Sequence, residues 1–409
     1  MRSSLFTFAT ACLAGIAQAL PALNEPSAAL KFSYGQEKVR GVNLGGWFVS
    51  EPWITPSLFD AIGGAAIDEW SFCSVLGATE AKKRLSAHWS SWITRGDFYS
   101  IAGAGMNHVR IPIGYWSVLP IQGEPYVQGA YEVLAQALDW AQGAGLKVMI
   151  DLHGASGSQN GFDNSGRYGA IKWQQGNTVQ HTLDVLNKIR DDHAYHPAVS
   201  SIQLLNEPFG PSLNIDGIKS FYTAGATALA KTNVTASFHD AFQQTSSWNS
   251  WYAPGNLLQD THHYEIFTQD QVALSPAAHV STACAFGGEM RGASHPIISG
   301  EWTGAMTDCT KYLNGFAKGA RFDGSFAGSS AVGSCAGLQT GSVASWSQEL
   351  KVQTRRFIEA QLDAYESNAG WLFWTWKTEG APGWDLGDLM RNGVFPNPVT
   401  ERMFAGQCG

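Results

Sequence analysis

Short apolar runs alternate along the chain with longer amphipathic stretches. Within residues 131–141, 179–189 and 346–365 the apolar positions recur at helical spacing, and Gly143 and Gly145 end the first of these stretches. The apolar runs predict eight strands: Arg40–Trp47, His108–Gly114, Lys147–Gly154, Ser201–Pro208, Ala236–Phe242, Leu257–Tyr264, Pro296–Trp302 and Trp371–Lys377. Such alternation is typical of a parallel sheet covered by helices. Eight strands predict an α/β protein with a single-domain (β/α)8 TIM barrel.

An open, doubly wound sheet is the alternative architecture. It usually has a glycine-rich turn directly after its first strand. The nearest candidate is Gly103-Ala104-Gly105, which lacks a third glycine and precedes a predicted strand. The barrel is therefore favoured. The Gly/Ser-rich segment 314–347 is interpreted as a long loop inside this domain, because no linker divides the chain.

The first residues resemble a secretory signal peptide. Arg2 gives a positive start, residues 5–14 are apolar, and Ala17-Gln18-Ala19 offers a small-residue cleavage site. We therefore predict a signal peptide at 1–19, a catalytic domain at 20–409, and a secreted protein of the extracellular space or cell wall. The apolar run is too short for a membrane anchor, and no later stretch is long enough to span a bilayer.

Secretion makes disulfides possible. Five cysteines remain after removal of the segment that holds Cys12, so at most two disulfides can form. The four C-terminal cysteines surround the long Gly/Ser-rich loop. They predict the pairs Cys309–Cys335 and Cys284–Cys408, which leaves Cys73 unpaired and buried. Asn233 begins an N-glycosylation sequon.

Composition narrows the class of ligand. The chain has 409 residues, a formal net charge of −8, 15% charged residues and 16 Trp. The negative charge disfavours nucleic acid as a partner. Many Trp with few charges suits the stacking of neutral sugars, although a Trp-rich core is an equal interpretation. We expect Trp47, Trp302, Trp371 and Trp376 in the core and Trp374 at a sugar site.

Two other enzyme classes lack their motifs in this sequence. There is no His-Glu-x-x-His or Cys-x-x-Cys pattern, so we expect neither a metal ion nor a cofactor. His262 and His263 are adjacent on a strand and should face opposite ways, which disfavours them as a metal pair. A Gly-x-Ser-x-Gly elbow is also missing, which disfavours a serine hydrolase.

Polar side chains stand near the ends of the predicted strands, where barrels place their catalytic groups. They are Arg110, His153, Asn206, Glu207, His262, Tyr264, Glu301 and Trp374. Glu207 and Glu301 each end an apolar run, and their strands face one another across the barrel. Two facing carboxyls suit glycoside hydrolysis, and this arrangement predicts the retaining separation of about 5–5.5 Å. Arg110 would keep the nucleophile ionised.

Several motifs together carry a family resemblance. Arg40–Trp47 (RGVNLGGW), Asn206-Glu207-Pro208 and Gly300-Glu301-Trp302 resemble glycoside hydrolase family 5. Asp151–Gly166 (DLHGASGSQNGFDNSG) and Gly370–Glu379 (GWLFWTWKTE) resemble its fungal exo-β-1,3-glucanase branch. The similarity runs from about residue 32 to 408, nearly the whole predicted mature chain.

The resemblance implies roles for individual residues. Glu207 matches the acid/base and Glu301 the nucleophile. The shared shell is matched by Arg110, His153, Asn206, His262, Tyr264 and Trp374. Glu51 and Asn164 would bind the terminal glucose, and Phe162 and Phe267 would form an aromatic pair at the pocket mouth. Trp53 stands where some relatives carry Tyr, so stacking is preserved but a phenol hydroxyl is lost.

The expected protein is a secreted, monomeric, retaining exo-β-1,3-glucanase. It would release glucose from the non-reducing ends of β-1,3-glucan and transfer glucosyl groups to sugars at high acceptor concentration. The exo preference depends on residues 154–173, which would close one end of the groove. The alternatives are an endo-acting β-glucanase or β-mannanase of the same fold, and a wall-glucan-binding protein with a dead active site.

Overall fold

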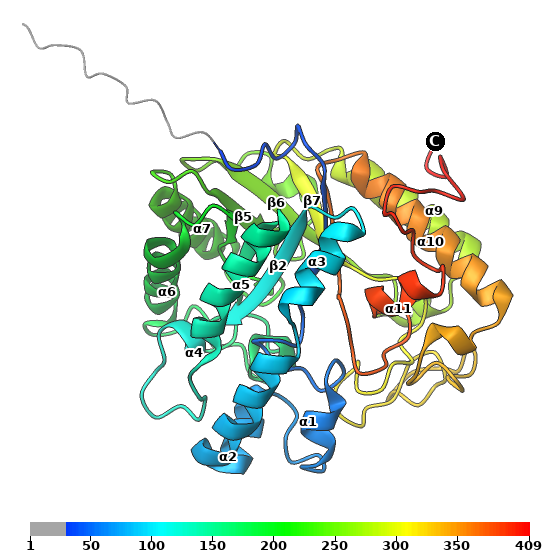
Figure 1. Cartoon of the computed structure of the whole chain (residues 1–409), viewed down its shortest axis with the longest axis horizontal. Helices are drawn as coiled ribbons and strands as arrows, with labels where there is room; N and C mark the ends of the chain where they lie inside the picture. Colours follow the sequence, from blue (N-terminus) through cyan, green and yellow to red (C-terminus); the bar gives the residue numbers. More distant parts are fainter. Residues whose placement is uncertain (1–29) are drawn as a thin grey trace, which may run out of the picture.

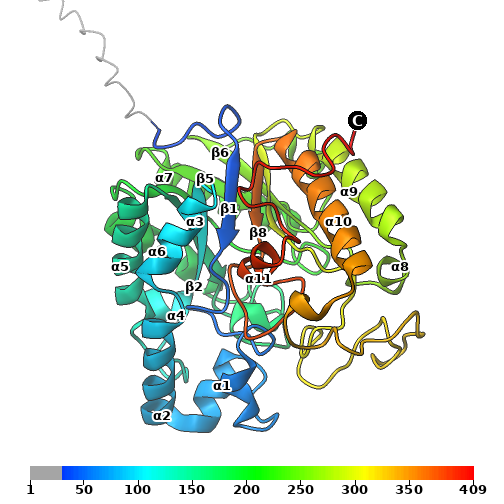
Figure 2. The same cartoon turned by 45° about the vertical axis from the view of Figure 1, so that its right-hand side comes forward.

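Eight parallel strands close into a barrel (Figures 1 and 2). The computed structural model describes residues 30–409, so the predicted signal peptide and Cys12 lie outside it. The strands are β1 Val39–Asn43, β2 His108–Gly114, β3 Lys147–Gly154, β4 Val199–Gln203, β5 Thr235–His239, β6 Leu257–His263, β7 Ile297–Trp302 and β8 Gly370–Phe373. Each strand pairs with the next, and β1 pairs with β8 through Val39 and Gly370. The prediction of a (β/α)8 barrel is confirmed.

Helices surround the barrel, as Figure 1 shows for α5, α6 and α7 on one side and α9 and α10 on the other. The α-helices are α1 Pro56–Asp60, α2 Glu69–Ser91, α3 Arg95–Gly103, α4 Tyr115–Val118, α5 Ala130–Ala144, α6 Thr178–His193, α7 Ile215–Leu229, α8 Gln269–Val272, α9 Pro276–Met290, α10 Gln348–Glu366 and α11 Leu386–Arg391. The predicted helices correspond to α5, α6 and α10. Gly145 ends α5 in the left-handed conformation, whereas Gly143 lies within the helix.

Four strands end three or more residues earlier than the apolar runs predicted, and β6 ends one residue earlier, at His263. β1, β4, β5 and β8 stop at Asn43, Gln203, His239 and Phe373, and the rest of each run is loop. Gly46, Glu207 and Ala241 have φ of 67°, 44° and 56°, values that are incompatible with a strand. After β8, the backbone N–H of Thr375 bonds Trp384 instead of a neighbouring strand. The error arose because these loops are as apolar and as buried as the strands.

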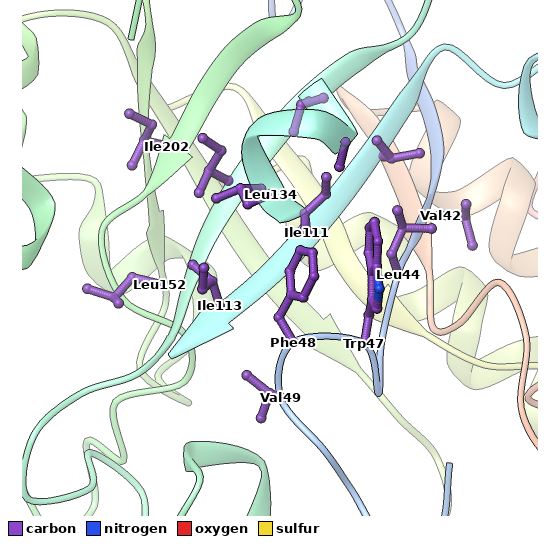
Figure 3. Packing of buried hydrophobic residues seen from close by; sticks show 14 of the residues in the cluster. Val42, Leu44, Trp47, Phe48, Val49, Ile111, Ile113, Leu134, Leu152 and Ile202 are labelled. Atoms are coloured by element: carbon purple, nitrogen blue, oxygen red, sulfur yellow. The ribbon is translucent and has the colours of Figure 1, made fainter. Parts of the chain in front are cut away.

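The strands are buried on both faces. The outward residues Ile111, Ile113 and Ile202 belong to the same hydrophobic cluster as Leu134 of α5 (Figure 3), and all four are fully buried. Each buried Ile or Leu contributes on the order of 1.5–3 kcal/mol. Alternate positions point into the barrel, where one apolar layer contains Val39, Met149, Leu258, Ile298 and Leu372. The polar residues described below lie nearer the carboxyl ends of the same strands.

Two disulfides hold the C-terminal part of the chain together. They are Cys284–Cys408 and Cys309–Cys335, the pairs that the sequence predicted, and Cys73 is a buried free thiol. Most of the segment between β7 and α10 is irregular, as expected, with one 3-10 turn at Val343–Ser345. Among residues 30–409, none of the helices combines the length and the apolar character that a membrane span requires.

Candidate active site

A cavity of about 460 Å³ opens at the carboxyl ends of the strands. Eight of the predicted site residues line it: Glu51, Phe162, Asn164, Glu207, Tyr264, Phe267, Glu301 and Trp374. The other four predicted residues, Arg110, His153, Asn206 and His262, are not part of its lining. Arg110 bonds Glu301, and His262 bonds Glu207. Asn206 bonds Arg110, and His153 stacks on Trp374. The structure therefore brings the predicted set together around one cavity.

Arg110 organises the floor of the site. Its Nη1 donates to Glu301 Oε1 at 2.8 Å and its Nη2 donates to Asn206 Oδ1 at 2.7 Å. Its Nε donates to Gln203, and Asp151 lies 3.1 Å from Nη2. The guanidinium is fully buried, a costly position that these charge-assisted bonds offset. One rigid side chain thus fixes Glu301 and the neighbour of Glu207.

Glu301 is held on both carboxylate oxygens. Arg110 bonds Oε1, and the Tyr264 hydroxyl donates to Oε2 at 3.0 Å. Burial raises the pKa of Glu301, against the lowering effect of the positive charges of His262 and Arg110. Burial also raises the pKa of Tyr264, so that its hydroxyl keeps the proton that it donates. The carboxylate is aimed and desolvated, as a nucleophile requires.

Glu207 faces Glu301 from the loop after β4. Its Oε1 is 2.7 Å from His262 Nδ1, and its Oε2 accepts from Asn164 Nδ2 at 3.2 Å. Burial raises its pKa, but the hydrogen bond and positive charge of His262 outweigh burial, so the pKa lies below its ordinary value. Its φ of 44° is uncommon for a residue with a Cβ and directs the side chain into the cavity.

His262 also limits the separation of the two carboxyls. Its Nδ1 is 2.7 Å from Glu207 Oε1 and 3.5 Å from Glu301 Oε2. These two oxygens can therefore be no farther apart than the sum of the distances, about 6.2 Å. Inverting glycosidases need a gap of roughly 6.5–9.5 Å for a water molecule, whereas retaining enzymes have roughly 5–5.5 Å. The observed limit lies below the inverting range.

Several buried polar atoms at the site have no hydrogen-bond partner within residues 30–409. They include Glu51 Oε1, His153 Nε2 and Asn206 Nδ2, and also Trp384 Nε1 of the cavity lining. Buried polar groups are nearly always satisfied, so these atoms indicate a ligand with several hydrogen-bonding groups. His153 is oriented by a 2.6 Å bond from Nδ1 to Asp151 and by stacking on Trp374, with ring centroids 5.5 Å apart.

Glu51 supplies a further polar group at the cavity. Burial, with the nearby charge of Asp163, raises its pKa well above the ordinary value, which favours the protonated form that can donate as well as accept. Trp53 Nε1 donates to Glu51 Oε2 at 2.9 Å. Trp53 stands where some relatives carry Tyr. Its indole N–H therefore provides a hydrogen bond at this position although the Tyr hydroxyl is absent.

Aromatic side chains complete the lining. Phe162 and Phe267 are 37% and 40% exposed, which places both at the cavity mouth. Trp374 is buried against the cavity wall, whereas Trp47, Trp302, Trp371 and Trp376 lie in the core, as predicted. Sequence reasoning missed several lining residues, namely Asp163, Tyr168, Phe242, Lys318, Arg321 and Trp384. Asp163 lies inside the motif Asp151–Gly166, between two predicted residues, and that motif was the available signal. No pattern marks the others, because loop packing brings them to the cavity.

One group of side chains has the spacing of a metal site. Of the described residues, Glu207, His239 and His262 place ligand atoms within 4.8 Å of one another. Hydrogen bonds already use the facing atoms of Glu207 and His262, whereas His239 Nε2 has no partner among the described residues. His262 Nδ1 bonds Glu207, and His239 Nδ1 accepts from the Ala241 N–H, so its Nε2 carries the proton. We assign no ion to this group, and the expectation of a metal-free enzyme stays a prediction.

The barrel and its facing carboxyls define a glycoside hydrolase, and the family comparison agrees. Residues 76–321 match the cellulase model of glycosyl hydrolase family 5, and the chain belongs to this family. It is 51% identical to a probable glucan 1,3-beta-glucosidase A of Aspergillus niger over 98% of this chain and 97% of that protein. It is 48% identical to a glucan 1,3-beta-glucosidase of Blumeria graminis, over 98% and 96% of the two chains.

Solved structures show the same fold at greater evolutionary distance. A rutinosidase from Aspergillus niger aligns over 88% of this chain and 98% of its own, with a TM-score of 0.70 and 21% identity. At that identity the likeness concerns the fold alone. The family resemblance predicted from the motifs is confirmed by the family model and by the fungal relatives.

Proposed function

We propose that the protein is a retaining exo-β-1,3-glucanase, which releases glucose from the non-reducing ends of β-1,3-glucan. The observation that carries the proposal is the pair Glu207 and Glu301, which face one another within about 6.2 Å and share His262. The names of the fungal relatives support the linkage and the glucose product.

The reaction follows from the hydrogen bonds of the two carboxyls. Glu301, aimed by Arg110 and Tyr264, attacks the anomeric carbon while Glu207 protonates the departing glycosidic oxygen. A glucosyl ester forms on Glu301. Glu207, now ionised, takes a proton from a water molecule as the water oxygen attacks the anomeric carbon, which breaks the ester to Glu301 and releases glucose with retained configuration. A second sugar in place of water gives transfer.

The unpartnered atoms of Glu51, His153 and Asn206 support recognition of a single terminal glucose. Glucose hydroxyls both donate and accept, which matches a protonated carboxyl, an imidazole and an amide. The Asn206 amide, held by Arg110, lies next to the acid in the chain and is placed to bond a hydroxyl whose contact strengthens as charge develops.

Contacts between loops support the exo preference. Tyr168, in the segment 154–173 expected to close the groove, accepts a 2.7 Å hydrogen bond from Lys318 of the long loop after β7. Both residues line the cavity. The two loops thereby form one wall beside Asn164 and Asp163, which favours a pocket for a chain end over a groove for a chain interior.

Trapping of the covalent intermediate tests the proposal directly. A 2-deoxy-2-fluoroglucoside with an activated leaving group should label the protein once, and mass spectrometry of the peptides should place the sugar on Glu301. Labelling elsewhere would overturn the assignment, and turnover without trapping would argue for inversion.

Product analysis distinguishes the remaining alternatives. On laminarin an exo enzyme releases glucose from the first time point, whereas an endo-β-glucanase releases oligosaccharides first. A β-mannanase would prefer mannan, and a dead glucan-binding protein would not turn over a nitrophenyl glucoside.

The cellular setting is also part of the proposal. We propose a secreted monomer, on the strength of the resemblance of residues 1–19 to a signal peptide and the two disulfides. Asn233 of the sequon is partly exposed between α7 and β5, where a glycan could be attached. Gel filtration and glycosidase treatment of the secreted protein test both points.

A further inference from the structure

The His262 ring lies between two carboxylates at its two nitrogens. Nδ1 is 2.7 Å from Glu207 Oε1, and Nε2 is 3.3 Å from Asp260 Oδ2. An ionised carboxylate only accepts hydrogen bonds, so satisfying both contacts requires a hydrogen on each ring nitrogen. The geometry therefore favours an imidazolium, with Asp260 and Glu207 at opposite ends.

Asp260 is fixed by its neighbours, and its position explains why the Gly300-Glu301-Trp302 motif begins with a glycine. Its Oδ2 accepts from Gln203 Nε2 at 2.8 Å, and the carboxylate is fully buried. A Cβ added to Gly300 would lie 2.0 Å from Asp260 Oδ1. Gly300 thus leaves room for the Asp260 carboxylate. A larger residue before Glu301 would displace Asp260.

We propose that Asp260 is a positioning residue of the reaction, which keeps His262 protonated and aimed at Glu207, so that His262 stores the proton that Glu207 delivers. This proposal rests on the proposed function of the site. At rest Glu207 is ionised and the proton is on His262. When substrate binds, the Nδ1–H bond breaks as an O–H bond forms on Glu207, leaving neutral His262.

The proton then completes a closed cycle. Glu207 passes it to the glycosidic oxygen as the bond from that oxygen to the anomeric carbon breaks and the ester to Glu301 forms. In the second step a water molecule gives one proton to Glu207 and its oxygen to the anomeric carbon, which breaks the ester and restores Glu301. The proton on Glu207 returns to His262 Nδ1, and no other reactant is needed.

Several charged or titratable groups face His262 from the surrounding strands. They are Glu207 after β4, His239 of β5, Asp240 after β5, Asp260 of β6 and Glu301 of β7, while Arg110 of β2 and His153 of β3 lie near the Glu301 and Glu207 carboxyls. Burial alone would lower the pKa of His262, but Glu301 and Asp260 outweigh burial and raise it well above the ordinary value. Removal of Asp260 should therefore lower the pKa of His262.

The test compares two isosteric variants of neighbouring buried carboxyls. Asp260→Asn removes the charge at His262 Nε2. Asp240→Asn is the matched control, because Asp240 is also buried but bonds Thr261 and the Phe242 N–H, not His262. Without Asp260 the His262–Glu207 pair loses its single proton more readily. The alkaline limb of kcat/KM on laminaribiose should therefore move down by about one pH unit or more.

A change of substrate separates proton supply from general damage. A dinitrophenyl glucoside leaves without protonation, so its kcat/KM should show no shifted alkaline limb in Asp260→Asn. An unshifted limb on laminaribiose, or an equal shift in Asp240→Asn, would overturn the proposal. A loss of activity at every pH on both substrates would show that Asp260 has a structural role only.

Histidine-selective NMR of the wild-type protein tests the proposal without relying on a folded Asp260 variant. The His262 signals, assigned by their loss in His262→Gln, should report an imidazolium at pH 7. A neutral His262 ring at pH 5 would overturn the stored-proton role. This measurement needs no catalysis, so it stays informative even if the chain fails to hydrolyse glucan, the outcome that would instead refute the proposed function.

Discussion

Arg110 Nη1 lies 2.8 Å from Glu301 Oε1, and both side chains are almost completely buried in the barrel. The same guanidinium reaches Asn206, the chain neighbour of Glu207, at 2.7 Å. A buried arginine without partners would be strongly destabilising. The cost of burying Arg110 is offset by its bonds to Glu301 and Asn206. The stability of the barrel interior and the alignment of the proposed catalytic pair therefore depend on the same residue.

Replacement of Glu301 by Gln should abolish turnover and leave sugar binding. The amide cannot attack the anomeric carbon, but it has nearly the same shape and can still bond Tyr264. We expect kcat on laminarin to fall by more than about a thousandfold. Calorimetry with laminari-oligosaccharides should show binding within a few-fold of the wild type. Activity near the wild-type value would refute Glu301 as nucleophile.

Replacement of Glu207 by Ala should affect substrates according to their leaving groups. Natural glucan needs protonation of the departing oxygen, so its kcat/KM should fall by about 10²–10⁴-fold. A dinitrophenyl glucoside should lose far less in the first step. Added azide should speed the second step and yield β-glucosyl azide, visible by NMR. Equal losses on both substrates would count against Glu207 as the acid.

The fold and most of the site could be predicted from the sequence for a physical reason. Parallel strands buried on both faces appear in the sequence as runs of apolar residues. A polar residue at the end of such a run is therefore easily recognised as a candidate site residue. Glu207, Glu301, Arg110 and His262 were found in this way. The disulfide pairs were predictable because few pairings could enclose the loop around residues 314–347.

Two kinds of residue escaped this reasoning. Gln203 and Asp260 lie inside strands, where a polar residue pointing into the barrel looks like a local exception to the apolar run. Asp260 alternates with Leu258 and His262 along β6, and this period of two was the available signal. Tyr168 and Lys318 escaped because they meet only when two long loops pack against each other.

A buried carboxyl near the site predicts how stability varies with pH. Glu69 of α2 is fully buried and accepts from Trp116 Nε1 and the Ser50 N–H, both at 2.9 Å. Burial raises its pKa to about 7. The folded pKa of Glu69 exceeds the unfolded value of roughly 4.3, so the protonated carboxyl stabilises the folded state. This contribution to the free energy of unfolding is fully present below about pH 4 and is lost as the pH rises through 7.

The melting temperature should therefore fall between about pH 5 and pH 8, and Glu69→Gln should make that fall shallower. The contribution is on the order of 3 kcal/mol at most. The other buried carboxyls keep part of the slope in the variant. Glu132→Gln, at an exposed position of α5, is the control and should retain the wild-type slope. An unchanged slope in Glu69→Gln would contradict the raised pKa.

The two disulfides should have separable effects, because only Cys309–Cys335 closes a short loop that itself forms part of the cavity wall. Cys309 and Cys335 close a loop whose ends are 26 residues apart and which carries Phe316, Lys318 and Arg321 to the cavity. Replacement of both cysteines by Ser should free this wall, raise KM for laminarin several-fold and lower the stability of the loop by about 3 kcal/mol.

The matched control is Cys284→Ser with Cys408→Ser, which releases the C-terminus from α9. That variant should lose melting temperature but keep its KM, since the short loop that carries Phe316, Lys318 and Arg321 keeps its own disulfide. Equal KM values in the two variants would show that the long loop holds its place without the covalent link, and that the Lys318–Tyr168 contact is sufficient to close the pocket.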